Sequence, residues 1–407
     1  GSEMCIRDRF SGIKTLINMK KLLVLLYLIL ASWSVRAQQD SVRVSLLTCA
    51  PGTEIYELFG HTAIRYENPA EGKDLVFNYG IFSFNTPNFV LRFVKGETDY
   101  RLGVVPYSYF EGEYAVRGSS VYQQTLNLTD EEKQKIWDLL EENYRPGNRI
   151  YRYNYFYDNC TTRARDKIED CIDGKVVYPQ AEEGVTFRDI VHRCTKGNEW
   201  DELGIDLCLG SEADVPIDGR KQMFAPFNML EAARGAVIMQ GDSVRPLVLS
   251  ESKVVDVEPE EAEPGFPLSP LSCVCILLVV TCIIVWLQLK WKKVIWAWDL
   301  LLFGAQGLAG CIIAFLFFFS IHPTVGSNWL IVLFNPIPLI YLPVMIYKAI
   351  KGRKDLYHLI NMAYLTFFIM IMPFIQQEFN VTVLPLALCL LVCSTGHVFL
   401  YYRQNSK

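Results

Sequence analysis

The amino-acid sequence predicts an α+β exported domain followed by an all-α membrane domain of five transmembrane helices. Three observations indicate this: a short apolar leader, strand-like alternation and helical spacing up to about residue 250, and five long apolar stretches after residue 269. The chain has 407 residues, which exceeds a single small module because domains average roughly 150 residues.

The N-terminal segment has the pattern of a secretory signal. Met19-Lys20-Lys21 precedes an apolar run over residues 22–30, and Val35-Arg36-Ala37 supplies the small residues at which a signal peptidase cuts. We therefore expect residues 1–37 to be a tag-like leader and signal peptide, with the mature chain starting near Gln38. A retained N-terminal anchor is the alternative, although the apolar run is short for a membrane span.

Five apolar stretches are long enough to cross a bilayer. They cover about residues 271–289, 297–321, 329–347, 357–374 and 381–402. Lys and Arg follow the first, third and fifth stretches, whereas residues 321–328 and 376–380 contain neither. The positive-inside rule then places the basic connections in the cytoplasm. We expect a multi-pass membrane protein with an exported N-terminal domain and a cytoplasmic C-terminus.

Charge divides the chain at the same place. Residues 38–268 carry 24 basic and 39 acidic side chains, whereas residues 269–407 carry nine basic and three acidic ones. The acidic half would repel a polyphosphate, so a nucleic-acid partner is not expected. Residues 251–268 are rich in acidic residues and contain prolines, which is typical of an extended linker. We therefore expect an exported domain at 38–250, an acidic linker at 251–268 and a five-span domain at 269–407.

Residue periodicity predicts the elements of the exported domain. Alternation of apolar and polar residues predicts strands near residues 42–47, 61–66, 75–79 and 121–128. Thr129 with Glu132 forms a capping-box pair at the start of one helix. A second helix should begin near Asp158-Asn159, because Cys160, Ala164, Ile168 and Cys171 recur at helical spacing.

Cys160 and His61 are the residues best placed for nucleophilic chemistry. A cysteine in the first helical turn meets unpaired N–H groups and the positive end of the helix dipole, which stabilise a thiolate. His61 follows Gly60 on a predicted strand and could accept the thiol proton. The alternative is a buried structural cysteine and an unrelated surface histidine.

The cysteine count leaves at least one thiol of the exported domain without a partner in that domain. Besides Cys160 the domain contains Cys49, Cys171, Cys194 and Cys208, whose pairing the sequence does not reveal. Five is an odd number, so one thiol is left buried, bonded to another chain or reactive. The spacings do not fit a zinc site, and we expect no metal or other cofactor.

Four segments and the five-span tail resemble a known family. The segments are LLTCAPG (46–52), ELFGHT (57–62), FNYG (77–80) and YNYFYDNCTTR (153–163). They resemble the Lnb family of Bacteroides-type lipoprotein N-acyltransferases. The order of a His-bearing strand before an Asn-Cys helix start is also similar to the circularly permuted, NlpC-type papain-like fold of lecithin retinol acyltransferase. The resemblance implies a permuted papain-like periplasmic domain in which Cys160 is the nucleophile and His61 the base.

A third polar residue should orient His61. Papain-like sites use a polar residue on the strand after the histidine for this purpose, and Asn78 has that position. Asp158 is the rival, but we expect it to cap the second helix with its carboxylate.

Three further residues are candidates for contacts with substrate or oxyanion. Asn159 and Arg163 flank Cys160, and Arg163 could hold a phosphate or carbonyl oxygen. The alternative for Arg163 is an ion pair with Asp166 or Glu169. His322 lies in a short turn on the exported side and could meet a lipid phosphate, or it is simply an interfacial residue.

The resemblance implies a lipoprotein N-acyltransferase of the bacterial inner membrane, multi-pass, with its N-terminal domain in the periplasm and its C-terminus in the cytoplasm. The enzyme would move a fatty acyl chain from a membrane phospholipid, through a Cys160 thioester, to the α-amino group of a diacylglyceryl-cysteine lipoprotein. Two alternatives use the same sequence features. One is a membrane-tethered cysteine peptidase or amidase acting on cell-wall peptide, and the other is a non-catalytic lipoprotein-binding membrane protein.

Overall fold

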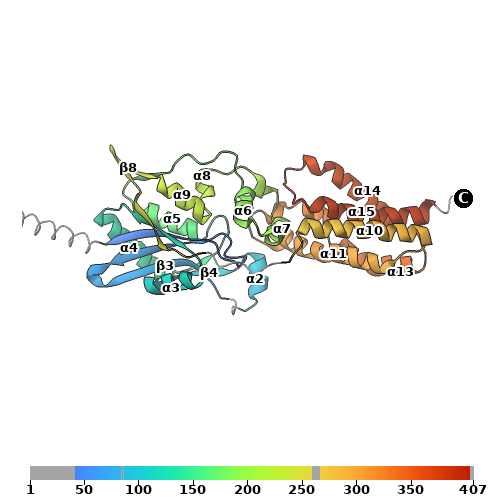
Figure 1. The fold of residues 1–407 in the computed structure, drawn as a ribbon, viewed down its shortest axis with the longest axis horizontal. Helices are drawn as coiled ribbons and strands as arrows, with labels where there is room; N and C mark the ends of the chain where they lie inside the picture. The colour runs from blue at the N-terminus through green and yellow to red at the C-terminus, as the bar shows by residue number, and fades with distance from the viewer. Residues whose placement is uncertain (1–41, 84, 86, 259–265, 404–407) are drawn as a thin grey trace, which may run out of the picture.

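The computed structural model describes residues 42–83, 85, 87–258 and 266–403. The molecule is elongated, with a mixed α and β domain at one end and a bundle of long helices at the other (Figure 1). This arrangement confirms the predicted order of an α+β domain followed by a five-helix membrane domain. The signal peptide expected at residues 1–37 lies outside the described residues.

A seven-stranded antiparallel sheet forms the centre of the exported domain, with the order β10-β5-β1-β2-β3-β4-β6. The four strands expected from alternation all occur in it. The strands are β1 (Arg43–Cys49), β2 (His61–Asn68), β3 (Lys73–Ile81), β4 (Asp99–Pro106), β5 (Val121–Leu126), β6 (Ile150–Arg152) and β10 (Val248–Val255). A smaller sheet contains β7 (Lys175–Val177), β8 (Val237–Gln240) and β9 (Ser243–Pro246).

Strand β10 corrects the expected start of the acidic linker. Glu251 pairs with Gln124 and Val255 pairs with Val121 of β5, so residues 251–255 belong to the sheet and not to a linker. The strand lies at the sheet edge and exposes most of its side chains. Polar and acidic residues are tolerated at such an edge, and their composition therefore concealed the strand.

Two helices flank the main sheet where the sequence predicted them. Helix α4 (Asp130–Tyr144) begins with the expected capping box, in which Thr129 N–H donates to Glu132 Oε2 over 2.8 Å. Helix α5 (Cys160–Cys171) packs on β2 and β3. The remaining helices of the domain are α2 (Phe89–Lys95), α3 (Tyr107–Val116), α6 (Phe187–Thr195), α7 (Glu199–Cys208), α8 (Gly219–Gln222) and α9 (Pro226–Arg234).

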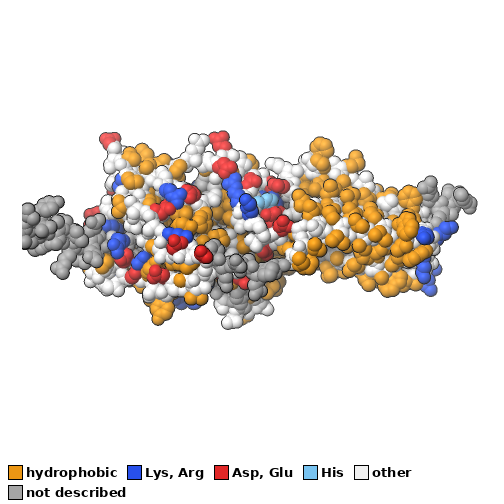
Figure 2. Space-filling view, viewed as in Figure 1, with side chains coloured by type: hydrophobic (Ala, Val, Ile, Leu, Met, Phe, Trp, Pro, Cys, Tyr) orange, Lys and Arg blue, Asp and Glu red, His pale blue; other side chains and the backbone are white. Residues whose placement is uncertain are grey.

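The membrane domain contains five helical segments long and apolar enough to span a bilayer. They are α10 (Pro270–Trp291), α11 (Trp296–Phe319), α12 (Leu330–Leu333) with α13 (Ile337–Ile350), α14 (Leu356–Ile371) and α15 (Val383–Val398). Figure 2 shows a largely hydrophobic outer surface along the bundle, with Lys and Arg gathered at the end far from the exported domain.

The third span is broken at Asn335-Pro336, between α12 and α13. A break leaves backbone carbonyls that a neighbour has to satisfy in the membrane. Gln306 of α11 donates its side-chain N–H to the carbonyl of Leu333 over 2.8 Å. Gly310 of α11 lies directly against the backbone of Asn335, where a side chain would overlap it.

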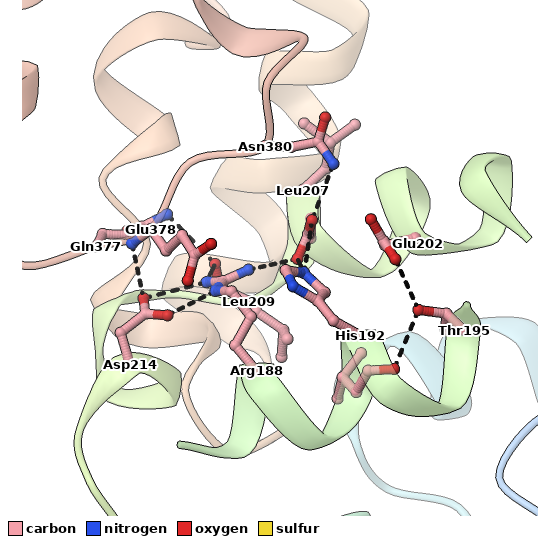
Figure 3. A network of polar contacts seen from close by, with 12 residues as sticks. Arg188, His192, Thr195, Glu202, Leu207, Leu209, Asp214, Gln377, Glu378 and Asn380 are labelled. Atoms are coloured by element: carbon pink, nitrogen blue, oxygen red, sulfur yellow. Dashed lines mark hydrogen bonds and ion pairs between the residues drawn. The ribbon is translucent and has the colours of Figure 1, made fainter. Parts of the chain in front are cut away.

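A buried polar network connects the exported domain to the membrane helices (Figure 3). Arg188 of α6 is only 1% exposed and donates to Asp206 over 2.7 Å and to Asp214 over 2.6 Å. Asn380, in the turn before α15, donates to the other oxygen of Asp206 over 2.9 Å. Removal of one partner from a buried charge network is costly, so these contacts fix the domain on the bundle.

The turn between α11 and α12 forms the second part of this junction. Asn328 donates to the carbonyl of Leu207 over 2.8 Å, and Ser211 donates to the carbonyl of Ser327 over 3.2 Å. Gly210 lies so close to this turn that an added Cβ would overlap Asn328 N. The exported domain is therefore docked directly on the turns at one end of the helices.

Candidate active site

His61 is the first residue of β2, next to a glycine that the local backbone requires. Gly60 has a φ of +75°, and an added Cβ would lie 2.5 Å from the carbonyl oxygen of Cys49. Only glycine adopts this conformation without strain and leaves room for the neighbouring strand. The close approach fixes where β2 starts and thus where the imidazole of His61 lies.

Asn78 of β3 contacts the imidazole of His61, as the order of the strands predicted. The distance from His61 Nε2 to Asn78 Oδ1 is 2.6 Å. A carbonyl oxygen only accepts hydrogen bonds, so His61 donates from Nε2. This tautomer leaves Nδ1 as the ring nitrogen that can accept a proton.

Cys160 occupies the first position of α5, as expected. The cap of this helix is Asn159, whose Oδ1 accepts the N–H groups of Thr161 and Thr162 over 2.9 Å each. Asn159 also donates to the carbonyls of Tyr155 and Phe224. Its side chain is fully engaged and 5% exposed. Asn159 therefore positions the helix start, which corrects its expected role as a substrate or oxyanion contact.

The thiol of Cys160 and the imidazole of His61 lie together between β2 and α5. Burial raises the pKa of the thiol, but the charge and hydrogen bond of His61 outweigh burial and lower the pKa of Cys160 to about 7. Burial lowers the pKa of His61, whereas Cys160 and Asn78 raise it, and the net direction is upward. The pair therefore favours a thiolate beside an imidazolium near neutral pH.

Gly80, Thr62 and Thr161 surround Cys160 and His61. Gly80 has a φ of +91°, and an added Cβ would lie 3.8 Å from His61 Cε1 and 3.9 Å from Cys160 Cβ. Thr62 and Thr161 share a hydrogen bond of 3.0 Å that connects β2 to α5. Thr62 directly follows His61 and Thr161 directly follows Cys160, but no local sequence pattern indicates that the two threonines meet.

Arg163 and Asp158 bind each other, and neither is free for the expected role. Arg163 donates to both carboxylate oxygens of Asp158 over 2.5 and 2.7 Å, and its guanidinium lies 3.7 Å from the ring centre of Tyr151. The helix cap expected of Asp158 is supplied by Asn159. The alternative partners considered for Arg163, Asp166 and Glu169, instead bind other arginines.

His322 lies at the domain junction. Its Nε2 is hydrogen-bonded within the protein, so this nitrogen is not available for the expected contact with a lipid phosphate. That nitrogen is 2.6 Å from the carbonyl oxygen of Phe93, and the two rings are 5.8 Å apart. Since a carbonyl only accepts, His322 donates to it and holds α2 against the end of α11.

The other thiols of the exported domain differ from Cys160. Cys49, Cys171, Cys194 and Cys208 form no disulfide, and burial raises the pKa of each. Two groups of side chains in the described ranges have a spacing that could hold a metal ion: Asp299 with Cys393 and His397, and His192 with Glu202 and Asp206. Neither group includes Cys160 or His61, so the pair has no metal ligand set around it.

The fold and the site define a polytopic membrane protein whose extramembrane α+β domain pairs a low-pKa cysteine with a histidine. Two family models match the chain: the Lnb N-terminal periplasmic domain over residues 30–193 and the Lnb transmembrane domain over residues 261–405. The chain belongs to the Lnb family. No curated protein and no solved structure matched it. Membership supports a lipoprotein N-acyltransferase type of role in a multi-pass inner-membrane protein.

Proposed function

We propose that this protein is a lipoprotein N-acyltransferase that uses Cys160 as its nucleophile and a membrane phospholipid as its acyl donor. One observation carries the proposal: the thiol of Cys160 at the start of α5 lies beside His61, which Asn78 holds in place, and the histidine lowers the pKa of Cys160 to about 7. A thiolate is the reactive form of cysteine, and its formation near neutral pH is what acyl transfer requires.

In the first half-reaction the Cys160 thiolate attacks an ester carbonyl of the phospholipid. The bond from the carbonyl carbon to the glycerol oxygen breaks, and the imidazolium of His61 gives its proton to that oxygen. The products are a lysophospholipid and an S-acyl enzyme. The backbone N–H of Cys160 points out of the helix start and suits the developing oxyanion, because the Asn159 side chain takes the next two N–H groups.

In the second half-reaction the α-amino group of a diacylglyceryl-cysteine lipoprotein attacks the thioester. His61 accepts a proton from the amine, the carbon–sulfur bond breaks, and the thiolate of Cys160 returns. Asn78 keeps His61 in the tautomer that exchanges protons at Nδ1, because it accepts from Nε2.

The docked membrane domain supports a lipid substrate. Donor and acceptor are both confined to the bilayer, so a site held over the ends of five helices meets them at high local concentration. The basic end of the bundle lies away from the exported domain (Figure 2). By the positive-inside rule we assign this end to the cytoplasm and the residues from near Gln38 to Val255 to the periplasm. A peptidase of soluble cell-wall peptide would need only one anchor.

Intact-mass analysis of the full-length protein in phospholipid vesicles tests the proposal. We expect the wild type to gain one fatty-acyl mass that hydroxylamine removes, and Cys160→Ser to gain none. Addition of a diacylglyceryl lipopeptide with a free amine should discharge the acyl enzyme and yield the N-acylated peptide. Cleavage of cell-wall peptide without any gain of a fatty-acyl mass would support the peptidase instead, and full N-acylation by Cys160→Ser would exclude the thiol mechanism.

A further inference from the structure

Helix α2 presents apolar side chains outward beside the membrane domain. Its residues Val90, Leu91 and Phe93 are 73, 53 and 45% exposed, and no residue of this helix is buried. Isolated exposed apolar residues are ordinary, but several on one short helix indicate a contact surface.

The apolar surface of α2 continues the lipid-facing surface of α11. Ile321 N–H donates to the carbonyl of Lys95 over 2.9 Å, and Ser320 donates to the carbonyl of Val94 over 2.8 Å. The adjoining end of α11 exposes Phe318 and Phe319. Because α2 is bonded to the end of a membrane span, its exposed side chains lie at the level where lipid headgroups meet acyl chains.

A series of aromatic contacts leads from α2 toward the nucleophile. Ring centres are 6.0 Å apart for Phe93 and Phe89, 5.7 Å for Phe89 and Phe82, and 5.0 Å for Phe82 and Tyr100. Tyr100 in turn lies 4.2 Å from Tyr153.

Two members of this series, Phe82 and Tyr153, lie near the nucleophile. Both pack against the core cluster that contains Tyr100, and Cys160 packs against the same cluster. Gly80 lies beside His61 and Cys160, and Phe82 is only two residues after Gly80 in the chain. The half-exposed ring of Tyr56 lies 6.4 Å from Phe82 on its other side.

We infer that α2 and the rings of Phe93, Phe89 and Phe82 form the binding site for the fatty acyl chain of the donor lipid. The acyl chain leaves the bilayer over Val90 and Leu91 and lies along the three phenylalanine rings, with its ester carbonyl at Cys160. Aromatic faces suit this ligand because they bury apolar area without imposing a fixed polar geometry. The continuity of α2 with the lipid-facing end of α11 identifies the occupant as a membrane acyl chain. This inference rests on the proposed acyltransferase function.

The test compares a bilayer donor with a water-soluble one in the same full-length protein. Leu91→Asp places a charge on the exposed face of α2, and Val116→Asp is the matched control on α3, where Val116 is 88% exposed. Helix α3 lies farther from the bundle along the molecule (Figure 1). The two readouts are S-acylation of Cys160 from phospholipid vesicles and its S-acetylation by p-nitrophenyl acetate.

We expect Leu91→Asp to slow acylation from vesicles about ten-fold or more, since the carboxylate replaces the apolar contact between Leu91 and the acyl chain. Acetylation should stay within about two-fold of the wild type, a margin well below that loss. Val116→Asp should change neither rate, and Val90→Asp should repeat the effect of Leu91→Asp.

Each other outcome has a defined meaning. Vesicle acylation by Leu91→Asp and Val90→Asp at the wild-type rate would overturn the acyl-chain site and leave the proposed function intact. An equal loss of acylation and acetylation would also overturn it, because the damage would then lie at the thiol itself. Acetylation of the wild type with no acylation from vesicles would refute the proposed function together with this inference.

Discussion

Replacement of His61 by alanine should change the reactivity of one thiol by a calculable amount. With His61 present the pKa of Cys160 is about 7, so about half of the thiol is ionised at pH 7. Without the imidazole the charge and the hydrogen bond of His61 are lost while burial remains, so we expect the pKa of Cys160 to rise to the ordinary value of about 9.0 or higher. The thiolate fraction then falls below about 1%, a decrease of about 50-fold.

Alkylation by iodoacetamide, followed by peptide mass mapping, measures this fraction. The wild-type rate at Cys160 should rise with pH through about 7, since the thiolate forms as the proton leaves. The His61→Ala rate should be about 50-fold lower at pH 7 and should approach the wild-type rate only in strong alkali.

Two internal controls accompany the measurement. Cys160→Ser should remove the label, and Cys171 and Cys194 should stay unlabelled at pH 7, because burial raises their pKa values to about 12 and about 11. Equal labelling of the wild type and His61→Ala at pH 7, or a wild-type rate that is flat between pH 6 and pH 8, would refute the ion-pair argument.

Three further substitutions, two of them with a control variant, test the residues that position His61 and the residues at the domain junction. Asn78→Ala should slow acyl-enzyme formation about ten-fold without lowering the melting temperature, because the imidazole of His61 is then no longer held in the tautomer protonated at Nε2. Gly60→Ala should destabilise the protein by about 1–2 kcal/mol in thermal unfolding, since its φ is positive, whereas Gly112→Ala on an open helix surface should not. Gly210→Ala should loosen the domain junction and increase proteolysis there, while Gly204→Ala, with open space around it, should behave as the wild type.

Local sequence patterns predicted the elements that carry the reactive pair. Alternation located the His61 strand, and the helical recurrence of Cys160 and Cys171 located α5, because both signals depend only on neighbouring residues. The capping box of Thr129 and Glu132 was confirmed for the same reason. The permuted papain-like relationship stays a prediction.

Features that depend on distant residues could not be predicted. Strand β10 has the composition of a linker and becomes a strand only by pairing with β5. The carboxylate of Asp158 was expected to cap α5, but Asn159 occupies that position because Arg163, one turn along, binds the carboxylate. His322 contacts Phe93, which is 229 residues away in the chain, and no local pattern indicates such a partner.

The docking of the exported domain through Arg188, Asp206 and Asn380 has a consequence for the lipid environment. A domain on a loose tether would hold its nucleophile at a variable height and tolerate bilayers of any thickness. Here the height of the sulfur above the hydrocarbon is set by the helix ends themselves. In the proposed reaction, hydrophobic mismatch, which costs fractions of a kcal/mol per ångström, would act on the distance between the Cys160 thiol and the lipid ester, so we expect turnover to depend on membrane composition.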